Sequence, residues 1–488
     1  MQIHQFLPLL FVLPLSQAVE TVLGLYIFSR HGDRTAKSTP PANLTDLGYK
    51  EVFDSGTWFR DQYVSSSAPR KIAGLNIDLV KLSQLAVSAP LDNVLMSSAQ
   101  GFLQGLYPPV GSTLGSDTLR NGTVVQAPLD GYQIVPVQTV TSGVGSEDSA
   151  WLQGAGNCAN AIVSSNNYFN SPRYMSLLNS TRGFYTSIAP TVNATFTPDQ
   201  INFENAYTSQ STFPHLPRFK PPNLTIYPVF DLLNVASIHN ASFPSSDLIT
   251  NSTLDQLRTL ADTHEYNLAF NSSEPIRAIS GATLGAQILR ALNNTVATNG
   301  KLPLNIQFGA YGSFQSFFGL ANLTATNPEF FGIPDYASSM TFELFTTAAP
   351  TPFPGPNDLS VRFLFHNGTT GNISTPIAYP LFGSPNVEMS WTAFVAGMNA
   401  FAVGGQSQWC SACGNTTGVC AVQGASGGPG AAAGESGGGM SNAVAGVIGA
   451  FVTLAVILLV EAVVMLVAGL RLVGKSRLRA AGATAAEK

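Results

Sequence analysis

The stretch LYIFSRHGDRTAK, residues 25–37, places a cluster of charged side chains directly after a run of apolar ones. Residues 22–28 have the composition of a short buried strand. In an open α/β sheet, ligands bind beyond the carboxyl ends of the strands, where Arg30, His31 and Arg34 are then expected to lie. The chain has six histidines, and here one of them stands between two arginines. The pattern indicates a site for a phosphate group.

The residue types in this cluster suit phosphoryl transfer. An imidazole can attack phosphorus and form a phosphohistidine, which divides hydrolysis into two easier steps, so His31 is the candidate nucleophile. Arg30 and Arg34 can hold the phosphate oxygens and stabilise the charge as the group moves. Gly32 allows the backbone to approach the ligand closely. The competing interpretation is a loop histidine beside two solvated arginines.

Strand and helix patterns alternate along the chain. The sequence predicts helices over 44–64, 173–188 and 274–296, a strand running into a helix over 92–111, a strand, turn and helix over 304–323, and strands at 341–347 and 360–368. This alternation predicts an α/β fold, with a sheet covered on both faces.

Both ends of the chain carry apolar segments outside this pattern. Residues 1–18 resemble a cleaved signal peptide. Residues 443–470 are long and apolar enough for one C-terminal transmembrane helix, and the basic residues that follow indicate a cytosolic tail over 471–488. The region between is expected to hold an ectodomain over 19–420 and a Gly/Ala-rich linker over 421–442. A lipid anchor is the alternative, although such signals end in an apolar tail.

These segments predict a single-pass type I glycoprotein of the plasma membrane or of the secretory pathway. Thirteen N-x-S/T sequons, from Asn43 to Asn415, all precede the predicted span. Charged residues make up 10% of the chain and the formal net charge is -5, so no nucleic-acid partner is expected.

The four cysteines, Cys158, Cys410, Cys413 and Cys420, predict two disulfides, with three possible connectivities. The C-x-x-C at 410–413 also raises the possibility of zinc, but no histidine lies nearby to complete a site. We expect neither a metal nor a cofactor.

Several motifs resemble the histidine acid phosphatases, the branch of the phosphoglycerate-mutase-like superfamily that includes phytases. RHGDRT matches the R-H-G-x-R-x signature of that family. LTDLG with WFRDQY, SSAQGFLQGLYPP, YASSMTFELF and VRFLFHNGT are similar to later segments, so the resemblance covers about residues 20–420. It implies a histidine-phosphatase core with a mainly helical insertion. It also implies His31 as nucleophile and Arg30 and Arg34 as phosphate clamps.

Two parts of the family pattern are missing. Val94 stands where the resemblance implies a third arginine. Tyr311 and Gly312 stand where it implies a His-Asp pair whose aspartate protonates the leaving oxygen. The dipeptide His264-Glu265 lies before the 274–296 helix rather than after it, so its sequence position does not make it a replacement. Asp33 and Glu343 are the carboxylates proposed for that role.

Three functions remain open on the sequence. The first is a membrane-anchored, glycosylated enzyme that binds phosphomonoesters and hydrolyses them weakly. The second is a non-catalytic cell-surface pseudophosphatase that keeps the anion pocket and binds a phosphate-bearing ligand. The third is a surface glycoprotein in which the signature is a relic. The sequence leaves the substrate, the replacement acid and the oligomeric state undetermined.

Overall fold

The computed structural model describes residues 20–140, 158–206, 229–241, 249–371, 374–418 and 420–421. The chain divides into two units, Met1–Gly424 and Ala425–Lys488, and all described residues belong to the first. The predicted signal peptide and the predicted span at 443–470 lie outside the described residues. Within the described ranges, no helix has the length and apolar character needed to cross a bilayer.

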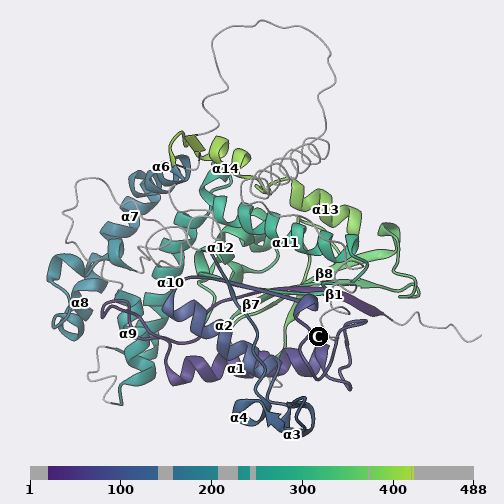
Figure 1. Cartoon of the computed structure of the whole chain (residues 1–488). Helices are drawn as coiled ribbons and strands as arrows, with labels where there is room; N and C mark the ends of the chain where they lie inside the picture. Colours follow the sequence, from purple (N-terminus) through teal and green to yellow (C-terminus); the bar gives the residue numbers. More distant parts are fainter. Residues whose placement is uncertain are drawn as a thin grey trace, which may run out of the picture. The chain divides into compact units, whose positions relative to one another are not determined.

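A mixed sheet forms the centre of the first unit (Figure 1). Its strand order is β10-β8-β7-β1-β6-β2-β5, and β9 pairs with β8. The strands β1, β6, β2 and β5 run parallel, whereas β7, β8, β9 and β10 add antiparallel pairs. The bounds are β1 (Thr21–Ser29), β2 (Leu85–Pro90), β5 (Gln138–Val140), β6 (Leu304–Phe308), β7 (Ser339–Thr346), β8 (Leu359–His366), β9 (Ile377–Tyr379) and β10 (Glu388–Ser390).

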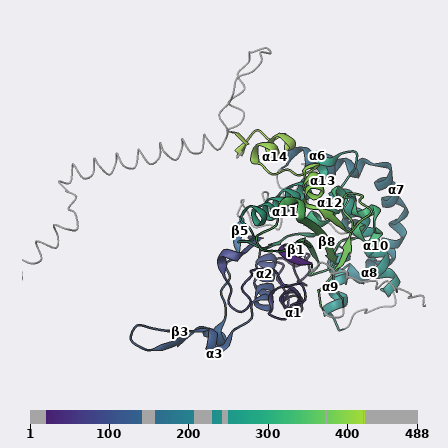
Figure 2. The same cartoon turned by 90° about the vertical axis from the view of Figure 1, so that its right-hand side faces the viewer.

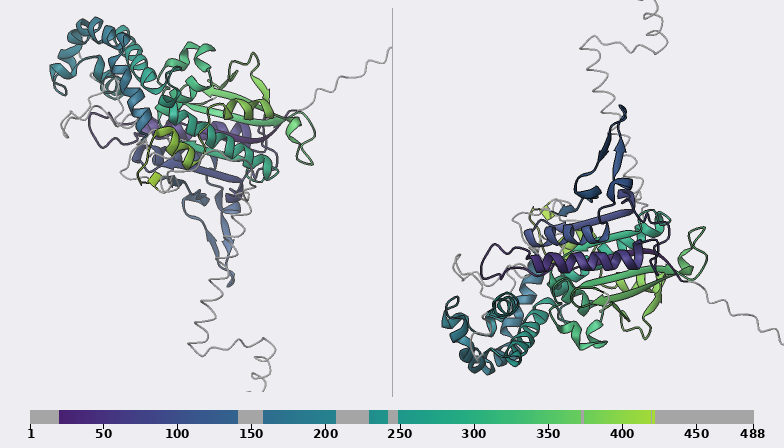
Figure 3. Two further views of the ribbon diagram at one scale, coloured as in Figure 1. Left: turned by 90° about the horizontal axis from the view of Figure 1, so that it is seen from above. Right: turned by 90° about the horizontal axis from the view of Figure 1, so that it is seen from below.

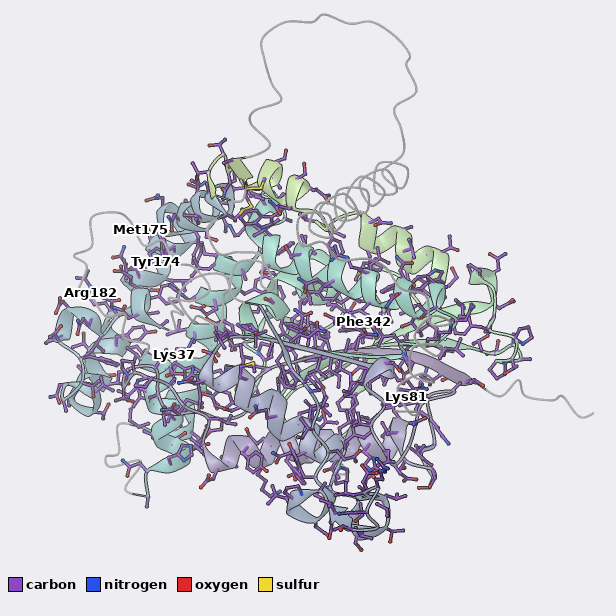
Figure 4. All side chains as sticks on the ribbon, viewed as in Figure 1. Lys37, Lys81, Tyr174, Met175, Arg182 and Phe342 are labelled. Atoms are coloured by element: carbon purple, nitrogen blue, oxygen red, sulfur yellow. A yellow bond between two sulfur atoms is a disulfide. The ribbon has the colours of Figure 1, made fainter. Side chains whose placement is uncertain are left out.

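Helices cover both faces of this sheet, as the sequence predicts. One face packs against α11 (Ile279–Ala297), α12 (Tyr311–Leu320) and α13 (Trp391–Asn399), in a core that includes Phe28 and Phe342. Figure 4 labels Phe342 at the centre of this layer. The other face packs against α1 (Asp46–Phe59) and α2 (Asn93–Leu106), in a core that includes Leu25 and Ile27. The right-hand view of Figure 3 shows α1 and α2 side by side beneath the sheet.

Alternate residues of β1 therefore enter different cores. Tyr26 and Phe28 belong to the first core, and Leu25 and Ile27 to the second. This is the period of two that a strand imposes, and it explains why the strand is apolar throughout.

A helical insertion lies beside the sheet and has a core of its own (Figure 1). Its described helices are α6 (Ala159–Asn167), α7 (Pro172–Ser180), α8 (Arg182–Val192), α9 (Val229–His239) and α10 (Asn251–Ala269). Tyr185, Leu257 and Phe203 are among the side chains buried in this core. The expectation of a mainly helical insertion is met by these helices.

A small β-hairpin projects from the other side of the sheet, as Figure 2 shows. It consists of β3 (Ser116–Thr118) and β4 (Val124–Gln126), and it is flanked by the short helices α3 (Gly111–Leu114) and α4 (Pro128–Gly131). It contributes no residue to the four buried cores.

Both predicted disulfides are present, and the structure selects one connectivity. Cys158 pairs with Cys413, and Cys410 pairs with Cys420. The first bond joins the start of the insertion to α14 (Gln406–Cys413), across a sequence separation of 255 residues. The two cysteines of the C-x-x-C motif therefore belong to different disulfides, which removes the basis for a zinc site there.

Most predicted elements are confirmed, with shifted bounds. The strand expected within 92–111 is wrong, because β2 ends at Pro90 and Asp92 already caps α2. Its carboxylate accepts the N–H groups of Val94 and Leu95, both at 2.8 Å. This is a regular N-cap, and α2 ends at Leu106, before the two prolines.

Candidate active site

The candidate site is a loop that leaves the carboxyl end of β1. Backbone hydrogen bonds from the neighbouring strands hold it in place. The N–H of Gly309 donates to Ser29 O at 3.0 Å, and the N–H of Arg30 donates to Ser338 O at 2.8 Å. The N–H of Ala337 donates to His31 O, also at 2.8 Å. The loop is therefore fixed from both sides by the segments that follow β6 and precede β7.

Two glycines allow α1 to pack directly on this loop. A Cβ on Gly32 would lie 2.1 Å from Gly48 O, and a Cβ on Gly48 would lie 2.0 Å from Asp33 O. Either distance is a severe clash with backbone, so both positions require glycine. Thr45 adds a cap at the same point, because its hydroxyl accepts the N–H of Gly48 at 3.1 Å and donates to Asp33 Oδ2 at 2.6 Å.

A second segment fixes the loop from α2. The N–H of Gly32 donates to Ser98 Oγ at 3.2 Å, and the Ser98 side chain is fully buried. The SSA motif of the sequence thus positions the residue next to His31.

The imidazole of His31 has a defined orientation. Its Nδ1 lies 2.8 Å from Gly32 O. A carbonyl oxygen only accepts, so Nδ1 carries the proton in the neutral ring and Nε2 carries the lone pair. The ring of Tyr336 lies 5.5 Å from that of His31, centroid to centroid. This tautomer leaves Nε2 as the nucleophilic nitrogen.

Both arginines lie around the same tyrosine ring. The guanidinium of Arg30 is 4.7 Å from the centre of Tyr336 and 5.5 Å from that of Tyr311, and it donates to Pro334 O. The guanidinium of Arg34 is 5.8 Å from Tyr336. Cation–π contacts of this kind hold guanidinium groups at fixed distances from a ring. The three predicted site residues are thus brought together around Tyr336.

Helix α9 of the insertion contacts the loop at two carboxylates, Asp231 of the helix and Asp33 of the loop. Arg34 forms a two-point ion pair with Asp231, and Asp231 Oδ2 also accepts the N–H of Lys37 at 2.8 Å. His239 Nε2 lies 2.5 Å from Asp33 Oδ2. Figure 4 labels Lys37 on the side of the sheet where the insertion lies. One end of α9 therefore contacts Arg34 and the other end contacts Asp33.

The whole signature is buried in this arrangement. Arg30, His31 and Arg34 are 3%, 1% and 0% exposed. The cavity that reaches Arg30 measures about 30 Å³ and is also lined by Phe230, Asn234 and Tyr336. A water molecule occupies about 30 Å³ in the liquid, so this space is too small for a phosphomonoester.

Glu51, on α1, places another carboxyl group next to the loop. Glu51 Oε2 accepts the N–H of Asp33 at 2.7 Å. Burial raises the pKa of Glu51 to about 7, and the neighbouring carboxylate of Asp33 acts in the same direction. Arg30 opposes this rise through its positive charge. Glu51 is therefore a carboxyl group near the signature that gains a proton in mildly acidic solution.

The late segment of the sequence places Tyr311 and Gly312 at the start of α12, directly after β6. The Tyr311 hydroxyl donates to Glu265 Oε2 at 2.6 Å, and Glu265 Oε1 lies 2.9 Å from His264 Nδ1. His264-Glu265 does precede α11 in the chain, as the sequence showed, but α10 brings the Glu265 carboxylate to Tyr311. The carboxylate is nevertheless bound to Tyr311 and His264, and Gly312 supplies no acid.

The other two proposed carboxylates are held by other side chains. Glu343 pairs with Leu25 in the strand register, four residues before the end of β1, which is about 13 Å along a strand. Its oxygens accept from Tyr63 at 2.5 Å and Arg70 at 2.6 Å. Asp33 is fully buried between Thr45 and His239. Val94 is buried in the first turn of α2, and no arginine replaces it there.

Three residues of this site escaped the sequence interpretation, Glu51, Asp231 and Tyr336, whereas Glu265 was considered and set aside. Tyr336 lies in a motif already recognised, YASSMTFELF, and its place just before β7 could have pointed to the site. Glu51 and Asp231 are acidic residues on helices, and no local pattern distinguishes them from solvent-exposed ones. Within the ranges that the structure describes, no group of three or more metal-ligating side chains is found.

Comparisons with known proteins agree with this architecture. A family model described as the histidine phosphatase superfamily (branch 2) matches residues 38–366, a range that begins just after the RHGDRT signature. A phytase from Citrobacter braakii is 12% identical with a TM-score of 0.50, and the match covers 81% of this chain and 99% of that chain.

Two further solved structures have lower TM-scores. A phytase from Hafnia alvei in complex with tartrate is 12% identical with a TM-score of 0.49, over 81% of this chain and 98% of that chain. A multiple inositol polyphosphate phosphatase from Bifidobacterium longum, in complex with inositol hexasulfate, is 12% identical with a TM-score of 0.42, over 79% and 94%. At sequence identities this low, a match to a solved structure is evidence about the fold alone. The family model, in contrast, spans more than half of the chain. The chain therefore belongs to branch 2 of the histidine phosphatase superfamily.

Proposed function

We propose that this protein hydrolyses phosphomonoesters through a phosphohistidine on His31. The observation that carries the proposal is the hydrogen bond from Nδ1 to Gly32 O, which directs the lone pair to Nε2 at the end of β1. Arg30 lies beside it and supplies positive charge for the phosphate oxygens.

The reaction then has two steps. Nε2 attacks phosphorus, the P–O bond to the leaving group breaks, and the leaving oxygen keeps the electron pair. Water then attacks the phosphohistidine, the P–N bond breaks, its electron pair returns to Nε2, and inorganic phosphate leaves while a proton of the attacking water passes to solvent. Because Gly312 has no side chain and the Tyr311 hydroxyl donates to Glu265, the leaving oxygen takes its proton from water. General acid catalysis contributes about 10²–10⁴-fold, so turnover is slow.

A direct assay tests this proposal. Purified full-length protein is incubated with p-nitrophenyl phosphate, quenched and examined for phosphate bound to residue 31. We expect slow release of nitrophenol and a labelled His31. His31→Ala is expected to lose both signals, and His366→Ala is the matched control because that histidine lies in β8 with its Nδ1 on Gly368 O. Turnover that survives His31→Ala contradicts the proposal.

A second function is supported by a specific contact. Asp231 already occupies the guanidinium of Arg34, so the clamp arginine is engaged by the protein itself. A non-catalytic protein that binds a phosphate-bearing ligand, and turns nothing over, is compatible with this pairing. Binding of inorganic phosphate without any phosphorylation of His31 would distinguish it from the enzyme.

The proposal includes a location on the cell surface or in the secretory pathway. The two disulfides support it, because such bonds persist in oxidising compartments. Thirteen sequons and the predicted signal peptide and span support it from the sequence. A truncation after Cys420 should be secreted and should shift in size on deglycosylation. A C-terminal tag that survives on the mature protein favours the transmembrane helix, whereas its loss favours a lipid anchor.

The substrate class follows only in part from the relatives. The solved proteins of similar fold include a phytase and an inositol polyphosphate phosphatase, so phosphorylated inositols belong among the substrates to be tested.

A further inference from the structure

A second, larger cavity lies beside the buried signature. It measures about 700 Å³, within the range of about 300–1,000 Å³ that holds small ligands. Helix α10 forms one wall, and residues 328–335 form the opposite wall. We call this cavity the α10 groove.

The α10 groove adjoins the candidate active site. Arg258, Ile333 and Asp335 line both the groove and the small cavity that reaches Arg30. The next residue, Tyr336, contacts the ring of His31. The groove therefore adjoins the position of a phosphate held by Arg30 and His31, on the far side of the Arg258–Asp335 pair.

The charges in the groove are balanced, with a small excess of acid. Its cations are Arg173 and Arg258, and its carboxylates are Asp262, Glu329 and Asp335. Arg258 lies 2.7 Å from Asp335 and 3.8 Å from Asp262, so its charge is already neutralised. A polyphosphorylated group would meet like charges here, and such juxtaposition costs binding free energy.

The remaining wall is aromatic and polar. The rings of Tyr266 and Phe331 lie 4.5 Å apart, and Phe331 is 46% exposed. Thr263 and Asn267 line the groove on the same helix as Tyr266. An exposed ring favours the flat carbon face of a cyclic ligand, and hydroxyl, amide and carboxylate groups hydrogen-bond its hydroxyls.

We propose that the α10 groove receives the leaving group of the substrate, and that this group is an uncharged polyhydroxylated ring. The substrate class is then a monophosphorylated sugar or cyclitol, which is bound well but turned over slowly because no acid protonates its leaving oxygen, and polyphosphorylated rings are rejected. This inference rests on the proposed function, because it needs the phosphate to lie at Arg30 and His31.

Binding measurements separate this inference from the chemistry. The full-length His31→Ala variant, which cannot turn over substrate, is titrated with inorganic phosphate, glucose 6-phosphate and inositol hexakisphosphate. We expect glucose 6-phosphate to bind about tenfold more tightly than phosphate, a difference of about 1.4 kcal/mol. Inositol hexakisphosphate is expected to bind no more tightly than phosphate.

Two variants of groove residues test whether the groove causes the preference for glucose 6-phosphate. Phe331→Ala should remove the advantage of glucose 6-phosphate and leave phosphate binding unchanged. Glu329→Lys should increase the affinity for inositol hexakisphosphate at least tenfold. Asp117→Lys makes the same charge change on the exposed β3–β4 hairpin and should have no effect.

Two results overturn the inference in distinguishable ways. Tighter binding of inositol hexakisphosphate than of glucose 6-phosphate, with phosphate still bound, refutes the groove assignment alone. Failure of all three probes to bind refutes the proposed function. The assignment of the groove as the leaving-group site is then refuted as well, because it depends on that function.

Discussion

Arg34 and Asp231 form a fully buried ion pair that joins the phosphate signature to the helical insertion. Arg34 Nη2 lies 2.7 Å from Oδ1 and Nη1 lies 3.3 Å from Oδ2, and neither side chain is exposed. The N–H of Lys37 donates to the same carboxylate. Two guanidinium donors and a backbone N–H are the groups that would also bind a phosphate, so Asp231 acts as an internal anion at this position.

Removal of Asp231 tests whether its carboxylate occupies an anion site beside Arg34. Asp231→Ala removes the carboxylate that neutralises the buried guanidinium of Arg34, which costs about 3–5 kcal/mol of folding free energy. Inorganic phosphate should restore much of that loss by taking the vacated place, since a ligand at about 100 times its Kd adds about 2.7 kcal/mol. Thermal unfolding with and without phosphate measures the effect, and Asp231→Asn serves if the alanine variant does not fold.

The matched control is Glu343→Gln, which alters a buried carboxylate in the middle of β7. It should lose stability without a marked phosphate dependence, because Arg70 and Arg362 retain a second carboxylate, Glu20. A phosphate-induced shift no larger in Asp231→Ala than in the parent protein would show that Arg34 does not face an anion site.

Glu51 predicts a specific pH dependence of stability. Its pKa is raised from 4.5 to about 7 in the folded protein, so the folded state holds a proton that the unfolded state loses above about pH 4.5. Stability therefore falls as the pH rises from about 4.5 to 7, and remains lower above 7. Glu51→Gln keeps an acceptor for the N–H of Asp33 and cannot ionise. Its melting temperature should match the parent protein at pH 4 and exceed it at pH 8.

Asp54→Asn on the same helix is the control for this prediction. Its side chain is 40% exposed and pairs with Lys50, so it should leave the melting temperature nearly unchanged at both pH values. A Glu51→Gln variant that gains equally at pH 4 and pH 8 would show that the carboxyl group does not titrate in this interval.

The fold and half of the site could be predicted because their signals are local. The apolar strand, the two glycines and the His-Arg cluster lie within 28 residues of one another, and each constrains the backbone directly. The alternation of strands and helices does the same for the sheet. The bounds shifted where a cap residue such as Asp92 begins a helix earlier than the periodicity indicates.

The rest could not be predicted because it depends on contacts between distant segments. Asp231 is 197 residues from Arg34, and Glu265 is 46 residues from Tyr311. Both are acidic residues on amphipathic helices, where a solvent-exposed position is the ordinary expectation. Only the packing of the insertion on the loop makes them part of the site.

The two disulfides should differ in their effect on stability. In the loop-entropy model, a bond that closes about 255 residues contributes about 5.5 kcal/mol and one that closes about 10 contributes about 2.7 kcal/mol. Replacing Cys158 and Cys413 by serine should therefore lower the unfolding free energy more than replacing Cys410 and Cys420. Denaturant titration of the two double variants makes the comparison. Equal losses would indicate that the insertion is held to α14 by packing alone.

Thiol labelling tests the pairing itself. The denatured, unreduced protein should show no free thiol, because the structure pairs all four cysteines of the chain. Two or more labelled cysteines would contradict the connectivity described here.

The absence of an acid at Gly312 predicts how the rate depends on the leaving group. An aryl oxide of low pKa departs readily without protonation, whereas an alkoxide does not, and general acid help matters most for the poor leaving group. Nitrophenyl phosphates should therefore be turned over, and sugar and inositol phosphates barely, even where a sugar phosphate binds well in the α10 groove.

Gly312→Asp should flatten this dependence. Gly312 lies in the first turn of α12, where a carboxylate is also favoured by the helix dipole. The variant is expected to gain most on alkyl phosphates and little on aryl phosphates, measured as kcat/KM over a series of esters. Gly312→Asn has nearly the same size but no acidic proton, so it should keep the steep dependence. Equal rates on alkyl and aryl esters in the parent protein, abolished by His31→Ala, would instead reveal a replacement acid, with Glu51 the first carboxyl group to substitute.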